Sequence, residues 1–220
     1  MKTVVISILL FLTHGCYLLD PPPPVRQAAC PSWRPEDILE NEPHWPPASW
    51  PIQLYLSDNF TNDELKSLLT GAFIVEDAVG ETNLFRFHIL TLDQMKDLAL
   101  RPSLDAFIMI NRYEDLPGLD TAADAFAETR AFVESSTGIV NRAFIAFHTC
   151  TDVAAMWPQI TNYYELAEVA AAHELGHALG LAHDTKNTHS IMYPRLINPK
   201  AKFEPEDIDY IRYQRTGSCP

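Results

Sequence analysis

The spacing of hydrophobic residues changes along the chain, and each pattern predicts a different element. Hydrophobic and polar residues alternate over residues 51–56, which predicts a strand. Over residues 61–80 the hydrophobic residues recur at helical spacing, and Thr61 and Glu64 stand three residues apart, as in a capping box. Gly80 is suited to end this helix because glycine adopts positive φ readily. We therefore expect a strand followed by a long helix.

Later segments repeat these two patterns. Strands are expected at residues 84–90, 106–110, 125–133 and 139–147, and helices at residues 162–179 and from Pro205 onward. Asn162 is the expected N-cap of the long helix, and proline suits the first turn of the last helix. This order predicts an α/β fold of the α+β kind, with a mixed, twisted sheet, a long helix and a C-terminal helix.

The first 48 residues differ from the rest. Lys2 precedes a short apolar run at residues 4–12, which is shorter than the roughly 20 residues that span a bilayer. A basic start and a short apolar core predict a secretory signal peptide over residues 1–15. Residues 16–48 include four consecutive prolines and predict an extended, Pro-rich tether. Residues 49–220 remain as one folded domain.

Cys16 leaves two forms of export open. Residues 13–16 are similar to a bacterial lipoprotein box, in which the cysteine after glycine carries the lipid, although Thr13 and His14 depart from its usual residues. The chain is thus expected either to be lipid-anchored at the cell envelope through Cys16 or to be secreted after cleavage at some point before Cys30.

Composition narrows the class of protein. Hydrophobic residues make up 47% of the chain and charged residues 20%, which is ordinary for a globular protein. The formal net charge of −13 repels polyphosphate and anionic lipid surfaces. We therefore expect no nucleic-acid partner, no membrane contact beyond a lipid on Cys16, and a monomer.

The strongest chemical signal is the segment HELGHALGLAHD at residues 173–184. In a helix, His173 and His177 lie on one face and can bind one ion, whereas Glu174 lies about 100° around the axis, where it can reach a water on that ion. Gly180 can turn the chain back so that His183 joins them. Three imidazoles and an open fourth position predict one catalytic Zn²⁺.

The pattern H-E-x-x-H-x-x-G-x-x-H, followed by S-I-M-Y-P at residues 190–194, resembles the metzincin proteases and, among them, the matrixins. The resemblance covers roughly residues 50–217. It implies a metzincin-like catalytic domain and a zinc metalloendopeptidase, a hydrolase in which Glu174 is the general base toward zinc-bound water. Met192 would lie beneath the metal as an apolar base.

The same resemblance implies how substrate binds. A peptide or protein substrate would pair, as an extended strand, with an exposed edge strand, which we assign to residues 125–133; a strand covered by a loop is the alternative. Val169 lies one helical turn before His173 and is expected to line the pocket for the side chain after the cut bond. The expected outer wall of that medium, apolar pocket is Pro194, Arg195 and Leu196.

Some features depart from the matrixin pattern. Asp184 follows the third histidine, where matrixins usually have Ser and adamalysins have Asp. A second, structural zinc site and Gly/Asp-rich calcium loops are not evident. His148 with Asp152 could hold a second metal, but an ordinary histidine is expected. Calcium ligands could also come from an acidic loop, which we expect to be solvated: Asp115, Asp120 and Asp124.

Apart from Cys16, the cysteines are Cys30, Cys150 and Cys219, which allow one disulfide and one odd thiol in an exported chain. The adamalysin resemblance favours a Cys150–Cys219 disulfide over Cys30–Cys219. Matrixin propeptides silence the zinc with a cysteine, but the residues flanking Cys30 lack the Arg, Gly and Asp of that switch. We expect activity without removal of the tether.

Two other functions stay open. The chain could be a zinc amidase that acts on a non-protein amide, or an exported binding lipoprotein that keeps the fold without turnover. The presence of Glu174 argues against the second, because a binding protein has no need of a general base.

Overall fold

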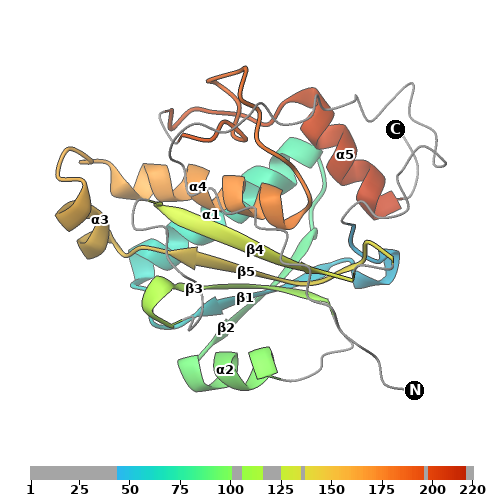
Figure 1. The fold of residues 1–220 in the computed structure, drawn as a ribbon, viewed down its shortest axis with the longest axis horizontal. Helices are drawn as coiled ribbons and strands as arrows, with labels where there is room; N and C mark the ends of the chain where they lie inside the picture. The colour runs from blue at the N-terminus through green and yellow to red at the C-terminus, as the bar shows by residue number, and fades with distance from the viewer. Residues whose placement is uncertain (1–43, 101–105, 116–124, 135–136, 196–197, 217–220) are drawn as a thin grey trace.

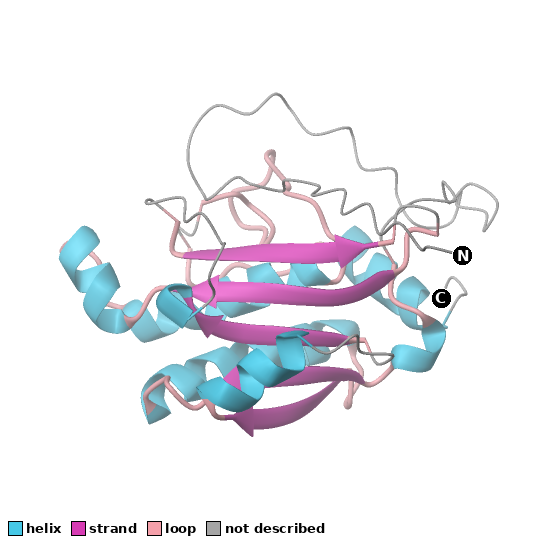
Figure 2. Ribbon diagram, turned by 60° about the horizontal axis from the view of Figure 1, so that its bottom comes forward, coloured by secondary structure: helices cyan, strands magenta, loops and turns pink. Residues whose placement is uncertain are grey.

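Five strands form one mixed sheet in the part of the chain that the computed structural model describes, which is residues 44–100, 106–115, 125–134, 137–195 and 198–216. The strands are β1 (Ile52–Ser57), β2 (Phe85–Leu90), β3 (Phe107–Arg112), β4 (Ala127–Val133) and β5 (Val140–Phe147). Their order is β2-β1-β3-β5-β4, and only the edge strand β4 runs antiparallel to its neighbour among them (Figure 2). The predicted fold class is confirmed, and β4 lies at the predicted edge.

Helices cover both faces of this sheet (Figures 1 and 2). On one face α1 (Asn62–Val79) packs along α4 (Tyr163–Ala178), and α5 (Pro205–Thr216) contacts α1. On the other face lies the shorter α2 (Leu92–Leu100), above a small cluster of Met95, Phe107 and Met109. The main core fills the space between the sheet and the α1–α4 pair. Three short helices complete the described elements: η2 (Pro47–Ser49), η3 (Tyr113–Asp115) and α3 (Cys150–Met156).

Local rules explain how several elements begin and end. The Thr61 hydroxyl accepts from the Glu64 backbone N–H while the Glu64 carboxylate accepts from the Thr61 N–H, which is the predicted capping box of α1. Gly80 ends α1 at a φ of 72°, in the left-handed region that favours glycine. These two signals were read correctly from the sequence, and they set the length of the helix that supports α4.

The helices α1 and α4 approach very closely, and Gly71 permits it. A Cβ atom on Gly71 would lie 2.4 Å from the Ala171 Cβ and 2.6 Å from the Glu168 carbonyl oxygen. Real Cβ atoms do not approach other heavy atoms so closely, since carbon contacts are optimal near 3.5–4.0 Å. The position of α4, which carries two of the predicted zinc ligands, therefore depends on the missing side chain of Gly71.

Two short helices were missed by the sequence analysis. The helices α2 and α3 were not predicted, although Thr149 and Asp152 form a capping box that starts α3. Asn162 is the N-cap residue of α4, as predicted, but its side chain makes no capping hydrogen bond. Both missed helices begin at a reciprocal cap: Thr149 pairs with Asp152, and Thr91 and Gln94 exchange the same two hydrogen bonds at the start of α2. These caps were the sequence signals for the two helices.

The folded domain begins earlier than the predicted boundary at residue 49. Trp45 is 1% exposed, and its indole N–H donates to the Ala178 carbonyl at the end of α4, at 2.8 Å. The backbone N–H of Trp45 donates to the Gln214 side chain, whose amide N–H donates in turn to the Leu179 carbonyl. The segment from His44 is thus packed rather than part of an extended tether. The predicted signal peptide, Cys16, Cys30 and the tether up to residue 43 lie outside the described residues.

Cys150 carries a free thiol in the structure. Its predicted partner, Cys219, lies outside the described residues, so the predicted disulfide is not supported. Within the described ranges, no helix has the length and apolar character needed to cross a bilayer.

Candidate active site

Three histidine side chains converge beside the end of α4. The Nε2 atom of His177 lies 3.0 Å from the Nε2 atom of His173 and 3.0 Å from that of His183, and the third pair is 3.3 Å apart. His173 and His177 stand one turn apart on α4, while His183 lies in the loop that follows. Of the His, Cys, Asp and Glu side chains that the structure describes, these three form a group that could hold a metal ion.

Gly180 provides the turn that brings His183 back, as predicted. Its φ is 90°, in the region that side chains rarely adopt. The N–H of Gly180 donates to the His177 carbonyl and that of Leu181 to the Gly176 carbonyl, both at 2.9 Å. These bonds close the helix in the manner of a C-terminal cap and reverse the chain direction within a few residues.

Backbone carbonyls hold two of the imidazoles in the form that binds metal. The Nδ1 atom of His173 lies 2.6 Å from the Ile191 carbonyl, and the Nδ1 atom of His177 lies 2.8 Å from the Leu181 carbonyl. A carbonyl only accepts hydrogen bonds, so each Nδ1 carries the proton and each Nε2 presents a lone pair. Three imidazoles whose Nε2 atoms lie within 3.3 Å of one another fit the ligand set that zinc prefers in catalytic sites.

Met192 lies directly under this part of α4. It is fully buried, and a Cβ atom on Gly176 would lie only 2.6 Å from the Met192 sulfur. The preceding residue, Ile191, supplies the carbonyl that orients His173. Met192 therefore packs against the helix that carries His173 and His177, as predicted. The turn that contains Met192 also orients His173.

Asp184, which departs from the usual matrixin residue, has a structural role here. Its side chain accepts from the backbone N–H groups of Lys186 and Asn187, at 2.9 and 3.3 Å. Its own N–H donates to the Met192 carbonyl at 2.8 Å. Asp184 thus folds the loop after the third histidine and ties that loop to the turn beneath the ligands.

Glu174 is a buried carboxyl next to the first histidine, 4% exposed. Burial raises the pKa of Glu174 to about 7; the hydrogen bond from Thr129 acts to lower it, and the charge of Glu128 acts to raise it. The Thr129 hydroxyl on β4 donates to Glu174 Oε2 at 2.6 Å. Sequence analysis did not single out Thr129, because a threonine in a strand is common and nothing in the spacing links it to α4.

A comparison of the sequence with models of protein families identifies the family of this chain. The matrixin model, which describes a peptidase family, matches residues 56–215. The chain belongs to the matrixin family. No curated protein sequence matches it. The matched range includes all three histidines, Glu174 and Met192, so the family and the geometry agree on a zinc-binding metalloprotease domain.

The residues that the sequence assigned to the substrate pocket of this matrixin are only partly described. Val169 is buried on α4, one turn before His173. Pro194 is partly buried and Arg195 is exposed, immediately after the Met192 turn. Leu196 lies outside the described residues. The pocket wall stays a prediction.

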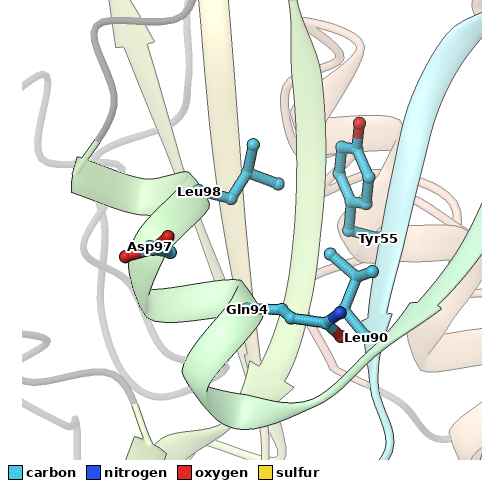
Figure 3. Close-up of a pocket in the computed structure, with 5 residues that line it drawn as sticks. All are labelled: Tyr55, Leu90, Gln94, Asp97 and Leu98. Atoms are coloured by element: carbon cyan, nitrogen blue, oxygen red, sulfur yellow. The ribbon is translucent and has the colours of Figure 1, made fainter.

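Other candidate sites do not form a second centre in the described part of this matrixin. Burial lowers the pKa of His148, which stacks on Tyr113, and Asp152 is engaged in the cap of α3. Asp115 accepts from the Asn59 amide at 3.0 Å, and the other two acidic residues of the predicted calcium loop lie outside the described residues. A cavity of about 210 Å³ between α2 and the sheet is lined by Tyr55, Leu90, Gln94, Asp97 and Leu98 (Figure 3). It lies on the face opposite α4 and contains none of the three histidines.

Proposed function

We propose that this matrixin is an exported zinc-dependent endopeptidase in which Glu174 is the general base. The observation that carries the proposal is the convergence of three Nε2 atoms from a segment in which the residue after the first histidine, Glu174, is a buried carboxyl. A zinc ion held by His173, His177 and His183 would supply a Lewis acid that polarises the scissile carbonyl and acidifies water.

Glu174 then accepts a proton from water and delivers it to the leaving amine. Without a metal ion, burial raises the pKa of Glu174 to about 7. A nearby cation would favour the carboxylate form, in which Glu174 acts as the base. The Ile191 and Leu181 carbonyls hold the imidazoles of His173 and His177 so that their Nε2 atoms stay unprotonated.

The strand β4 supports the proposed mode of substrate binding. It is the edge strand of the sheet on the side next to β5, and it packs against α4 (Figure 1). An edge strand offers backbone groups to an extended peptide, and those groups lie beside the helix that carries Glu174. Val169 and the segment from Pro194 would then contact the side chain after the cut bond.

Export rests on the sequence of residues 1–15, and lipid anchoring rests on Cys16. We propose that the folded domain acts outside the cytoplasm, as a monomer, either secreted or anchored through that cysteine. Fractionation of cells that express the full chain or its Cys16→Ser variant tests the anchor: the variant should move from the membrane fraction to the medium or soluble fraction.

The function itself is tested with a peptide library. The wild-type chain should cleave peptides, a chelator should abolish cleavage, and added Zn²⁺ should restore it. Glu174→Gln should keep zinc and lose turnover by roughly 100-fold or more, the usual scale for a general acid–base group. Native-rate cleavage by Glu174→Gln would refute the mechanism. An untouched library together with hydrolysis of a non-protein amide would favour an amidase, and inactivity on both would favour a binding protein.

A further inference from the structure

Thr129 and Glu174 form a buried hydrogen bond between the edge strand and the ligand helix. Thr129 is 5% exposed and Glu174 is 4% exposed. The Thr129 hydroxyl lies 2.6 Å from Glu174 Oε2 and 3.0 Å from the Glu174 carbonyl oxygen. The shorter contact has the length of a charge-assisted bond from a hydroxyl to a carboxylate. The hydroxyl has a single hydrogen, so Oε2 at the shorter distance is the main acceptor and the carbonyl oxygen the weaker one. Both oxygens belong to Glu174, so the contact holds its side chain close to its own backbone.

The strand holds the hydroxyl rigidly. In the β4–β5 ladder Thr129 pairs with Ile145, which is fully buried. Threonine is branched at Cβ and has few accessible χ1 angles, so a fixed backbone fixes the hydroxyl as well. The donor to Glu174 is therefore part of the sheet and does not move with α4 alone.

We propose that Thr129 is a positioning residue for Glu174, which it holds by Oε2 so that Oε1 stays available for proton transfer. This inference rests on the proposed function, in which Glu174 is the base. A hydrogen bond that only joined β4 to α4 would need no more than the longer contact, from the hydroxyl to the Glu174 carbonyl. The shorter contact goes to the reacting side chain, and it starts from the strand that is proposed to bind the peptide. Substrate and base are thereby oriented by one element.

The test compares Thr129→Val, which keeps the shape and removes the hydroxyl, with Thr129→Ser, which keeps the hydroxyl. Thr129→Val should lower kcat at least about tenfold, with KM changed less than about threefold, because the lost bond goes to a charged group that acts in the transition state. Thr129→Ser should return kcat to within about threefold of wild type. Thr70→Val is the matched control, since it removes an exposed hydroxyl bond on α1 and should leave kcat unchanged.

A double-mutant cycle separates positioning from packing. If Thr129 acts through Glu174, Thr129→Val should lower the residual kcat of Glu174→Gln by less than about twofold. Zinc affinity, measured by competition with a chelator, should stay within about twofold of wild type, because no ligand changes. Equal losses in both backgrounds, or equal losses for the Val and Ser variants, would show that Thr129 only packs.

A binding measurement covers the case in which no cleaved substrate is found. A peptide hydroxamate chelates zinc and shares its hydroxyl proton with a carboxylate beside the metal. The affinity of zinc-loaded Thr129→Val for this probe should fall at least about fivefold, and that of Thr129→Ser should not. Unchanged affinity of the Val variant would overturn the positioning role. Native activity of Glu174→Gln would instead overturn the proposed function, so the two failures are distinguishable.

Discussion

Replacing Gly71 with alanine tests whether the missing side chain between α1 and α4 sets the position of the ligand helix. The added Cβ atom would lie 2.4 Å from the Ala171 Cβ, 2.6 Å from the Glu168 carbonyl oxygen and 3.0 Å from the Ala172 nitrogen. Two of these three atoms belong to the backbone of α4, so no side-chain rotation can relieve the contacts. The helices must move apart by about 1 Å to restore ordinary contact distances.

The magnitude follows from two opposing effects. Overpacking a tightly packed interface costs typically 1–3 kcal/mol, and contacts this short to backbone atoms place Gly71→Ala near the upper end, at about 3 kcal/mol. Alanine favours a helix over glycine by about 1 kcal/mol. The net loss in the free energy of unfolding should therefore be about 2 kcal/mol.

Urea denaturation with excess chelator measures that loss without a contribution from metal binding. The double variant Gly71→Ala, Ala171→Gly removes the shortest contact and should recover about 1 kcal/mol relative to the sum of the two single changes. A Gly71→Ala variant as stable as wild type, or a double variant with no recovery, would refute the close approach of the two helices.

Two further predictions concern the ligand residues. His183→Ala should weaken zinc binding, measured by chelator competition, at least about tenfold, because it removes one of three imidazoles; equal affinity would mean that His183 is not a ligand. In the metal-free protein the folded state raises the pKa of Glu174 from 4.5 to about 7, so the folded state binds this proton more tightly than the unfolded state does. The stabilisation from Glu174 should be fully present below pH 4.5 and lost as the pH rises through about 7. Urea denaturation of the metal-free wild type and of Glu174→Gln, repeated at several pH values between these limits, gives the free energy of unfolding of each protein. The difference between the two free energies should change with pH, and a constant difference would contradict the raised pKa.

The ligand set could be predicted because its geometry is local. His173 and His177 are related by one helical turn, and Gly180 allows the reversal that returns His183, so spacing alone implied their convergence. The strand β4 was predicted from its sequence pattern, whereas its place at the edge of the sheet was implied by the metzincin resemblance. The ligand spacing and the strand pattern depend on residues close together in the sequence.

The features that the sequence did not predict involve contacts between segments far apart in the chain. Thr129 meets Glu174 across 45 residues, and no local pattern records which strand residue faces a helix. Trp45 lies within the predicted tether yet is buried; the prolines around it are typical of extended segments, and no local pattern records its contact with the end of α4. The proposed Cys150 disulfide came from a resemblance to another family, and the structure shows a free thiol at that position.

The end of α4 is held by residues from both ends of the domain. Trp45 contacts the Ala178 carbonyl across 133 residues, and its backbone contacts Gln214 across 169 residues. Gln214 follows the histidine-bearing helix in the chain, so the Leu179 carbonyl gains this partner only when α5 has packed. A chain that stops short of α5 should therefore hold the end of the histidine-bearing helix, and the three imidazoles beside it, less firmly.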